Sequence, residues 1–246
     1  MSHCVRHALA TAMITLSSLA ASACKSDRAA PSTQPAATRS SKNIGPATQP
    51  TTGVQTSTDQ SQRVEPFPGV TVLLDAHEVW IDAVACLREG YLEQVACAPD
   101  TREHESLVVT IVKPSQVHAA LLMAGFKPGS PGQWQYKDDS YSVIPPKGDA
   151  IDIRVLYADA QGRIVDEPVS LWIREKIKER QQPLGNDPWV FGGSRFDDNP
   201  EFMGEGEHYV ADMTGSIIGL VTFGDEVIGY SRVLADQEAV QEPVFE

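Results

Sequence analysis

A low-complexity stretch, residues 25–63, sets the limits of the part of this chain that can fold. It is rich in Ser, Thr, Pro, Ala and Gln and has almost no large apolar side chains. Such a composition buries too little surface to offset the entropy lost on ordering, so we expect a disordered linker. About 180 residues remain, from residue 64 to residue 246, which is enough for one domain with a sizeable core.

The segment before the linker has the layout of a secretory leader. Within residues 1–23, Arg6 and His7 form a weakly basic start, and an apolar stretch too short to span a bilayer follows. It ends in Ala21-Ser22-Ala23-Cys24, which matches a bacterial lipobox. We therefore expect residues 1–23 to be a lipoprotein signal peptide and residues 24–63 to be a linker anchored through a lipid on Cys24. The alternative is an ordinary signal peptidase cut that leaves Cys24 unmodified.

These features place the protein in the cell envelope, lipid-anchored on the periplasmic or outer side of a membrane. The net charge is −13, and because the leader and linker hold more basic than acidic residues, the acidic excess lies after residue 63. An acidic domain repels phosphates, so nucleic acid is not expected as a partner. The expected partners are the membrane, through the anchor, and an envelope protein or a small ligand.

Hydrophobic alternation predicts an α+β domain with a mostly antiparallel sheet and one or two helices. The predicted strands cover residues 70–75, 78–86, 92–97, 106–112, 151–157, 165–172, 189–193, 208–212 and 216–223. A helix is expected to begin at Pro114, with Val117 and Leu121 on its apolar face, and to end at Gly125. A weaker helical pattern covers residues 171–180.

Two cysteines remain once the leader is removed and Cys24 is lipidated. Cys86 and Cys97 each end a Val-Ala-Cys tripeptide, and in an oxidising compartment such a pair predicts a disulfide. Two buried free thiols are the alternative. A redox-active pair is a third interpretation, although the Cys-x-x-Cys spacing is absent. An iron–sulfur cluster would need about four cysteines.

Five parts of the chain have a recognisable pattern: Cys86–Cys97, Arg102–Leu107, Val117–Leu122 with Gly125-Phe126, Trp189–Ser194 and Tyr209–Gly224. Together they resemble the YdjY-domain family, and the resemblance spans most of residues 64–232. The resemblance implies a domain type, but it brings no activity and no set of catalytic residues.

The densest polar cluster is Arg102-Glu103-His104-Glu105-Ser106, just before an apolar strand. His104 and Glu105, with His118 from the predicted helix, form a candidate divalent metal site. The spacing is not that of a His-Glu-x-x-His motif, so a solvated surface cluster is the alternative. No cofactor other than this candidate metal is expected.

A second candidate site combines Ser194, Asp212 and Thr214, which follow or join predicted strands beside glycines. Their hydroxyl and carboxylate groups predict a polar ligand pocket. The alternative is that the glycines permit tight turns and the polar side chains support them.

Trp134 is a core candidate like the other tryptophans. Because Trp134 and Tyr136 lie in a Gly/Pro-rich loop, the alternative is that both are exposed for recognition. No complete catalytic constellation is present, so the leading hypothesis is a non-enzymatic envelope lipoprotein with an acidic ligand- or partner-binding domain. The competing hypothesis is a metal-dependent hydrolase that uses His104, Glu105 and His118.

Overall fold

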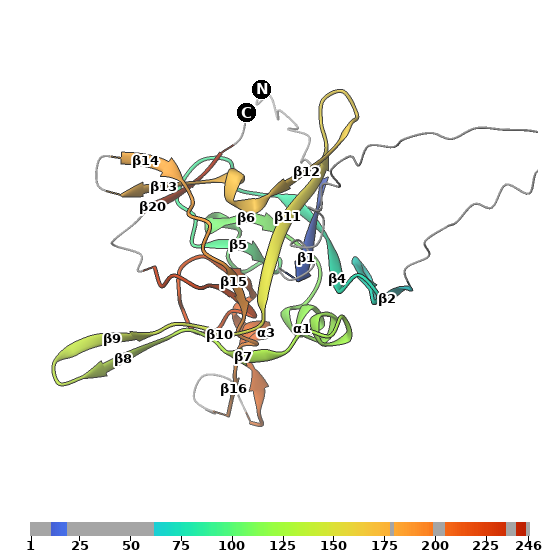
Figure 1. Ribbon diagram of the computed structural model, residues 1–246. Coiled ribbons are helices and arrows are strands. Elements are labelled where there is room, and N and C mark those ends of the chain that lie inside the picture. The colour runs from blue at the N-terminus through green and yellow to red at the C-terminus, as the bar shows by residue number, and fades with distance from the viewer. Residues whose placement is uncertain (1–10, 19–61, 178–179, 199–204, 235–239, 245–246) are drawn as a thin grey trace, which may run out of the picture.

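The computed structural model describes residues 11–18, 62–177, 180–198, 205–234 and 240–244 (Figure 1). Cys24 and nearly all of the predicted linker lie outside these residues. The strands that form the main sheet are β1 (Thr11–Ser18), β2 (Arg63–Phe67), β3 (Val70–Leu73), β4 (Glu78–Ala85), β5 (Gln94–Cys97), β6 (Ser106–Val109), β11 (Ala150–Ala158), β12 (Ile164–Pro168), β15 (Trp189–Phe191), β18 (Ser216–Gly219) and β19 (Ile228–Tyr230).

The main sheet closes on itself as an eight-stranded β-barrel. The strands follow one another in the order β1, β11, β15, β19, β18, β5, β6 and β4, and β4 pairs with β1 to complete the ring. β3 and β2 extend the sheet beyond β4, and β12 pairs with β11. The prediction of an α+β domain with an open, mostly antiparallel sheet was therefore wrong. Alternation reveals which residues form strands but not that the first and last strands pair.

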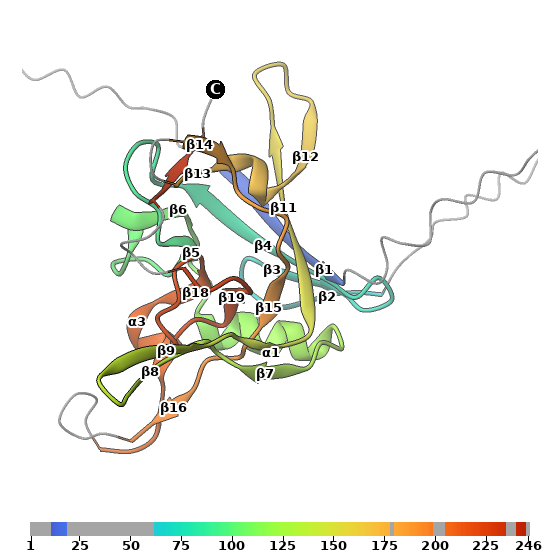
Figure 2. The same ribbon diagram turned by 60° about the vertical axis from the view of Figure 1, so that its left-hand side comes forward.

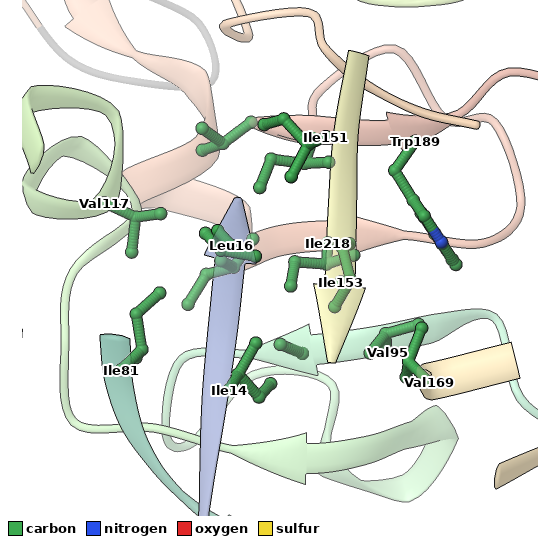
Figure 3. Packing of buried hydrophobic residues seen from close by; sticks show 14 of the residues in the cluster. Ile14, Leu16, Ile81, Val95, Val117, Ile151, Ile153, Val169, Trp189 and Ile218 are labelled. Carbon is green, nitrogen blue, oxygen red and sulfur yellow. The ribbon is translucent and has the colours of Figure 1, made fainter. Parts of the chain in front are cut away.

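The ring is closed by β1, which lies inside the range predicted to be a signal peptide. It pairs antiparallel with β11 along one edge and with β4 along the other (Figure 2). Its alternate residues Ala12, Ile14 and Leu16 are buried inside the barrel. Figure 3 shows Ile14 and Leu16 among core side chains from several other elements.

The strands predicted at residues 70–75 and 78–86 are confirmed as the antiparallel hairpin β3–β4, as is the long strand β11. In β4, buried Val79, Ile81 and Ala83 alternate with more exposed residues, as expected for a strand with one face on a core. The helix α1 (Pro114–Met123) is also confirmed, and it packs near β3, β4 and β18. Pro114 occupies its first turn, and Gly125 follows it with a φ of 91°.

Two predictions about local structure were wrong. The pattern at residues 171–180 is not helical but forms the 3₁₀ turn η3 (Val169–Trp172) followed by β13 (Ile173–Ile177). Residues 208–212 do not form one strand, because β17 (His208–Tyr209) leads directly into α3 (Val210–Thr214). In the first case, the pairing of β13 with β14 and β20 overrides local propensity.

Several short elements lie outside the ring of barrel strands. They are η2 (Glu103–Glu105), β7 (Pro128–Ser130), β8 (Gln133–Lys137), β9 (Ser140–Ile144), β10 (Lys147–Gly148), β14 (Arg180–Pro183), β16 (Phe196–Asp197) and β20 (Val240–Pro243). β13 lies between β14 and β20 in a separate three-stranded sheet, and β8 pairs only with β9. Within the described ranges, none of the helices has the length and apolar character needed to cross a membrane.

Candidate partner-binding surface

His118 lies on α1 and is half-buried in an aromatic and polar environment. Its Nδ1 lies 2.8 Å from the Tyr209 hydroxyl and 3.1 Å from the Gly193 carbonyl oxygen. The Phe191 ring meets the imidazole edge-on, with 4.9 Å between ring centroids. Burial lowers the pKa of His118, which favours the neutral imidazole, and burial raises the pKa of Tyr209. This pair therefore fastens α1 to the segments around β15 and β17.

The structure does not assemble the candidate metal site. The His104 side chain is 76% exposed, and its Nε2 lies 3.6 Å from Glu105 Oε2. Glu105 also lies 3.6 Å from the Arg102 guanidinium, while His118 is engaged on another element. Among the residues described here, no three or more His, Cys, Asp and Glu side chains gather closely enough to hold a metal ion. The residues predicted for a metal site thus serve separate local contacts.

The three candidate ligand-binding residues also serve different segments. Ser194 Oγ donates a hydrogen bond of 2.6 Å to the Asp225 carbonyl oxygen. The Asp212 carboxylate accepts hydrogen bonds from the Ser115 backbone N–H and hydroxyl, at 2.7 and 2.6 Å. Thr214 Oγ1 lies 3.3 Å from the Val210 carbonyl oxygen, one turn earlier in α3. Each side chain has a structural partner, and Asp212 satisfies a free donor at the start of α1.

A buried acidic pair between β18 and β19 was missed by the sequence analysis. Asp225 Oδ2 lies 3.2 Å from the Arg102 guanidinium, which stacks over Phe223 at 4.5 Å from the ring centroid. Glu226 Oε2 accepts hydrogen bonds from the backbone N–H groups of Gly224 and Asp225, at 2.9 and 3.1 Å. Burial raises the pKa of Glu226 to about 7. Adjacent acidic residues next to a glycine read as an exposed turn, so the sequence held no signal of this burial.

Cys86 and Cys97 are free thiols, so the predicted disulfide is not present in this structure. The Cys86 thiol donates to the Ser106 carbonyl oxygen at 3.0 Å, and Cys97 is fully buried. The pKa of Cys86 is raised to about 12, mainly by burial and to a smaller extent by the nearby Cys97. Burial also raises the pKa of Cys97. Neither thiol has the low pKa of a reactive cysteine.

The hairpin formed by β8 and β9 projects from the barrel (Figure 1). Trp134 lies opposite Val143, and Tyr136 lies opposite Tyr141, so these four side chains share one face of the hairpin. The two tyrosine rings lie 4.9 Å apart, and 62% of Tyr136 and 73% of Tyr141 is exposed. Trp134 ties the base of the hairpin to the barrel, because its indole N–H donates to the Thr222 carbonyl oxygen at 2.8 Å. We call these four residues the hairpin face.

A family model for the YdjY domain matches residues 70–245. The chain belongs to the YdjY-domain family. This confirms the resemblance seen in the sequence. No curated protein and no solved structure matched the chain.

The YdjY domain includes most of the barrel strands but not all of them. Seven of the eight ring strands, from β4 to β19, lie within residues 70–245, and so does the hairpin face. β1 lies outside the YdjY domain, although it completes the ring. The family domain therefore holds an almost complete barrel that is closed by a strand from elsewhere in the chain.

Proposed function

We propose that this YdjY-domain protein is an envelope lipoprotein that binds a partner protein through the hairpin face. The anchor is Cys24, the linker holds the barrel away from the headgroups, and the hairpin presents the contact. The supports for the anchor are the lipobox and the low-complexity composition of residues 25–63. Leader removal would take β1 with it, so the described chain corresponds to the precursor and the anchored protein begins at Cys24.

The observation that carries partner binding is the exposure of aromatic side chains on a projecting hairpin. Tyr and Trp are enriched at protein interfaces, where they bury a large area with few rotatable bonds. An isolated two-stranded hairpin is marginal in water, so a partner that covers one face would also stabilise it. Small ligands prefer concave sites, and the hairpin face is a convex projection. A protein partner therefore fits this surface better than a small ligand does.

The anchor is tested by intact mass spectrometry of the protein extracted from membranes. In the unaltered protein, the expected species begins at Cys24 and carries acyl chains. A Cys24→Ala variant, which cannot be lipidated, is expected to move to the soluble fraction. A chain that retains residues 1–23 in the membrane fraction would overturn the lipoprotein assignment.

Partner binding is tested with a photo-crosslinking amino acid at Tyr141 and, as a control, at Ile164. Both positions are 73% exposed, but Ile164 lies at the start of β12, away from the hairpin face. We expect a discrete crosslinked heterologous protein at position 141 only, lost when Tyr136→Ser removes a neighbouring aromatic ring. Equal crosslinking at both positions, or adducts that contain only a second copy of this chain, would overturn the proposal.

A further inference from the structure

The strand that closes the barrel is the one that lipoprotein processing would remove. β1 forms seven residue pairs with β11 and seven with β4, all antiparallel. On their other sides, β4 pairs with β3 and β6, and β11 pairs with β12 and β15. Without β1, β4 and β11 keep those neighbours, but each loses all of the strand pairing along the edge that faced β1.

We propose that, in the processed protein, the gap between β4 and β11 is a slot that binds one extended segment of a partner protein. The segment adds as a strand antiparallel to both edges, with a small residue and two large aliphatic residues at alternate positions. This rests on the proposed function, because the slot opens only if residues 1–23 are removed. It is a second binding site, separate from the hairpin face.

The inward side of the slot defines the residues that it accepts. Ala12 lies opposite Ala83, Ile14 lies between Ile81 and Val155, and Leu16 lies between Val79 and Ile153. All of these side chains are buried, and Figure 3 shows Ile14 and Leu16 on β1 with Ile81 on one side and Ile153 on the other. Ala12 is 4% exposed between Ala83 and Tyr157, so the first position is enclosed by its neighbours and is filled by a small residue. The pattern small-x-Ile-x-Leu is thus set by side chains of β4 and β11.

The outward side of the slot shows that residues 11–18 are an imperfect occupant. Met13 lines a surface groove of about 410 Å³ together with Trp80 and Asp82, so a long side chain fits that position. Thr15 is 6% exposed, and its hydroxyl oxygen is buried without a hydrogen-bond partner in the described structure. A buried unpaired hydroxyl is destabilising, so an aliphatic residue at this position would bind better.

An empty slot is unfavourable for physical reasons. Strands pair about 4.8 Å apart, so the edges of β4 and β11 lie about two strand spacings from each other and cannot pair directly. Two bare edges and the apolar side chains between them would be exposed to water. Strand addition satisfies both edges at once and restores the closed ring.

The proposed occupant comes from another protein, because the linker that remains after processing offers no suitable strand. Residues 25–61 contain only two large aliphatic side chains, Ile44 and Val54, which are far apart. This stretch therefore lacks three alternating apolar positions. A second processed copy has the same linker and has also lost β1, so it offers no better strand.

The slot is tested by fluorescence polarisation on the processed protein purified from membranes, after intact mass has confirmed the start at Cys24. The probe is a labelled peptide with the sequence of residues 11–18, flanked by lysines for solubility. We expect saturable binding that weakens at least about tenfold when Ile14 and Thr15 exchange places in the peptide. That control peptide has the same composition and length but a broken alternation. A Thr15→Val peptide is expected to bind at least about fivefold more tightly than the original.

A larger side chain in the protein, paired with a smaller one in the peptide, tests whether the peptide binds in the slot. Ala83→Val narrows the first position, so we expect about tenfold weaker binding of the original peptide and recovery with an Ala12→Gly peptide. Circular dichroism of the variant checks its fold, and the peptide controls need no change in the protein. No binding to the processed protein, or equal binding of the exchanged peptide, would overturn the slot and leave the lipid anchor intact. Retention of residues 1–23 would overturn both proposals, because β1 would then occupy the slot.

Discussion

Glu226 makes the stability of the barrel fall as the pH rises. Its carboxyl is 2% exposed, and burial raises its pKa from 4.5 to about 7. Between these pH values the folded protein holds a proton on this carboxyl that the unfolded chain releases. The folded state therefore binds more protons, so the free energy of unfolding decreases from pH 4.5 upward and the loss is complete above pH 7. The pKa difference corresponds to about 3 kcal/mol at most.

The perturbation is Glu226→Gln, which keeps a side-chain oxygen to accept the N–H groups of Gly224 and Asp225 and removes the charge. The assay is urea unfolding of the variant and the unaltered protein at pH 4, 6 and 8. We expect the variant to gain stability relative to the unaltered protein as the pH rises, by about 2–3 kcal/mol between pH 4 and pH 8. The amide N–H that the variant introduces changes its free energy of unfolding by the same amount at every pH. It therefore does not alter how the stability difference between the two proteins changes with pH.

The exposed Glu89→Gln variant serves as the control, because it removes one carboxylate at the surface. The reasoning about Glu226 would be refuted if the stability difference between Glu226→Gln and the unaltered protein were the same at all three pH values.

Two further outcomes follow from the described contacts. Asp212→Ala removes the acceptor for the Ser115 N–H at the start of α1 and is expected to lower the free energy of unfolding by about 1 kcal/mol. Ser115→Ala, which loses only the hydroxyl contact, should cost less, and an equal or smaller loss in Asp212→Ala would contradict this role. With a pKa near 12 for Cys86, iodoacetamide at pH 8 should leave Cys86 and Cys97 unmodified in the folded protein and alkylate both in urea without reductant. Protection that persists in urea until reductant is added would instead reveal a disulfide.

Local elements with strong patterns were predictable from the sequence. The alternation in Glu78–Ala85 and Ala150–Ala158 identified β4 and β11, and Pro114 and Gly125 marked the ends of α1. These features depend on neighbours in the sequence, so a single chain reveals them. The hairpin formed by β8 and β9 was not predicted as strands. Trp134 and Tyr136 were recognised as candidates for recognition, but Tyr141 was not.

The closure of the barrel was not predictable from such patterns. The apolar composition of residues 8–21 fits a leader, and residues 11–18 within them have the alternation that a barrel strand needs. Nothing local indicates that Ile14 lies beside both Ile81 and Val155. The placement of the residues predicted for a metal site depends on long-range structure in the same way. His104 and His118 are close in sequence, but one lies on the surface and the other is fastened to Tyr209.

The position of β1 also has a kinetic consequence for the precursor. The β3–β4 hairpin forms between neighbouring segments, whereas β1 must find β4 across the whole linker and β11 across much of the domain. Loop-closure entropy makes such long-range pairings slow, so the ring is expected to complete at β1 last. The seam between β4 and β11 is then the part of the barrel that stays open longest during folding. Hydrogen exchange pulses applied during refolding of the precursor would show these two edges gaining protection after the other strands.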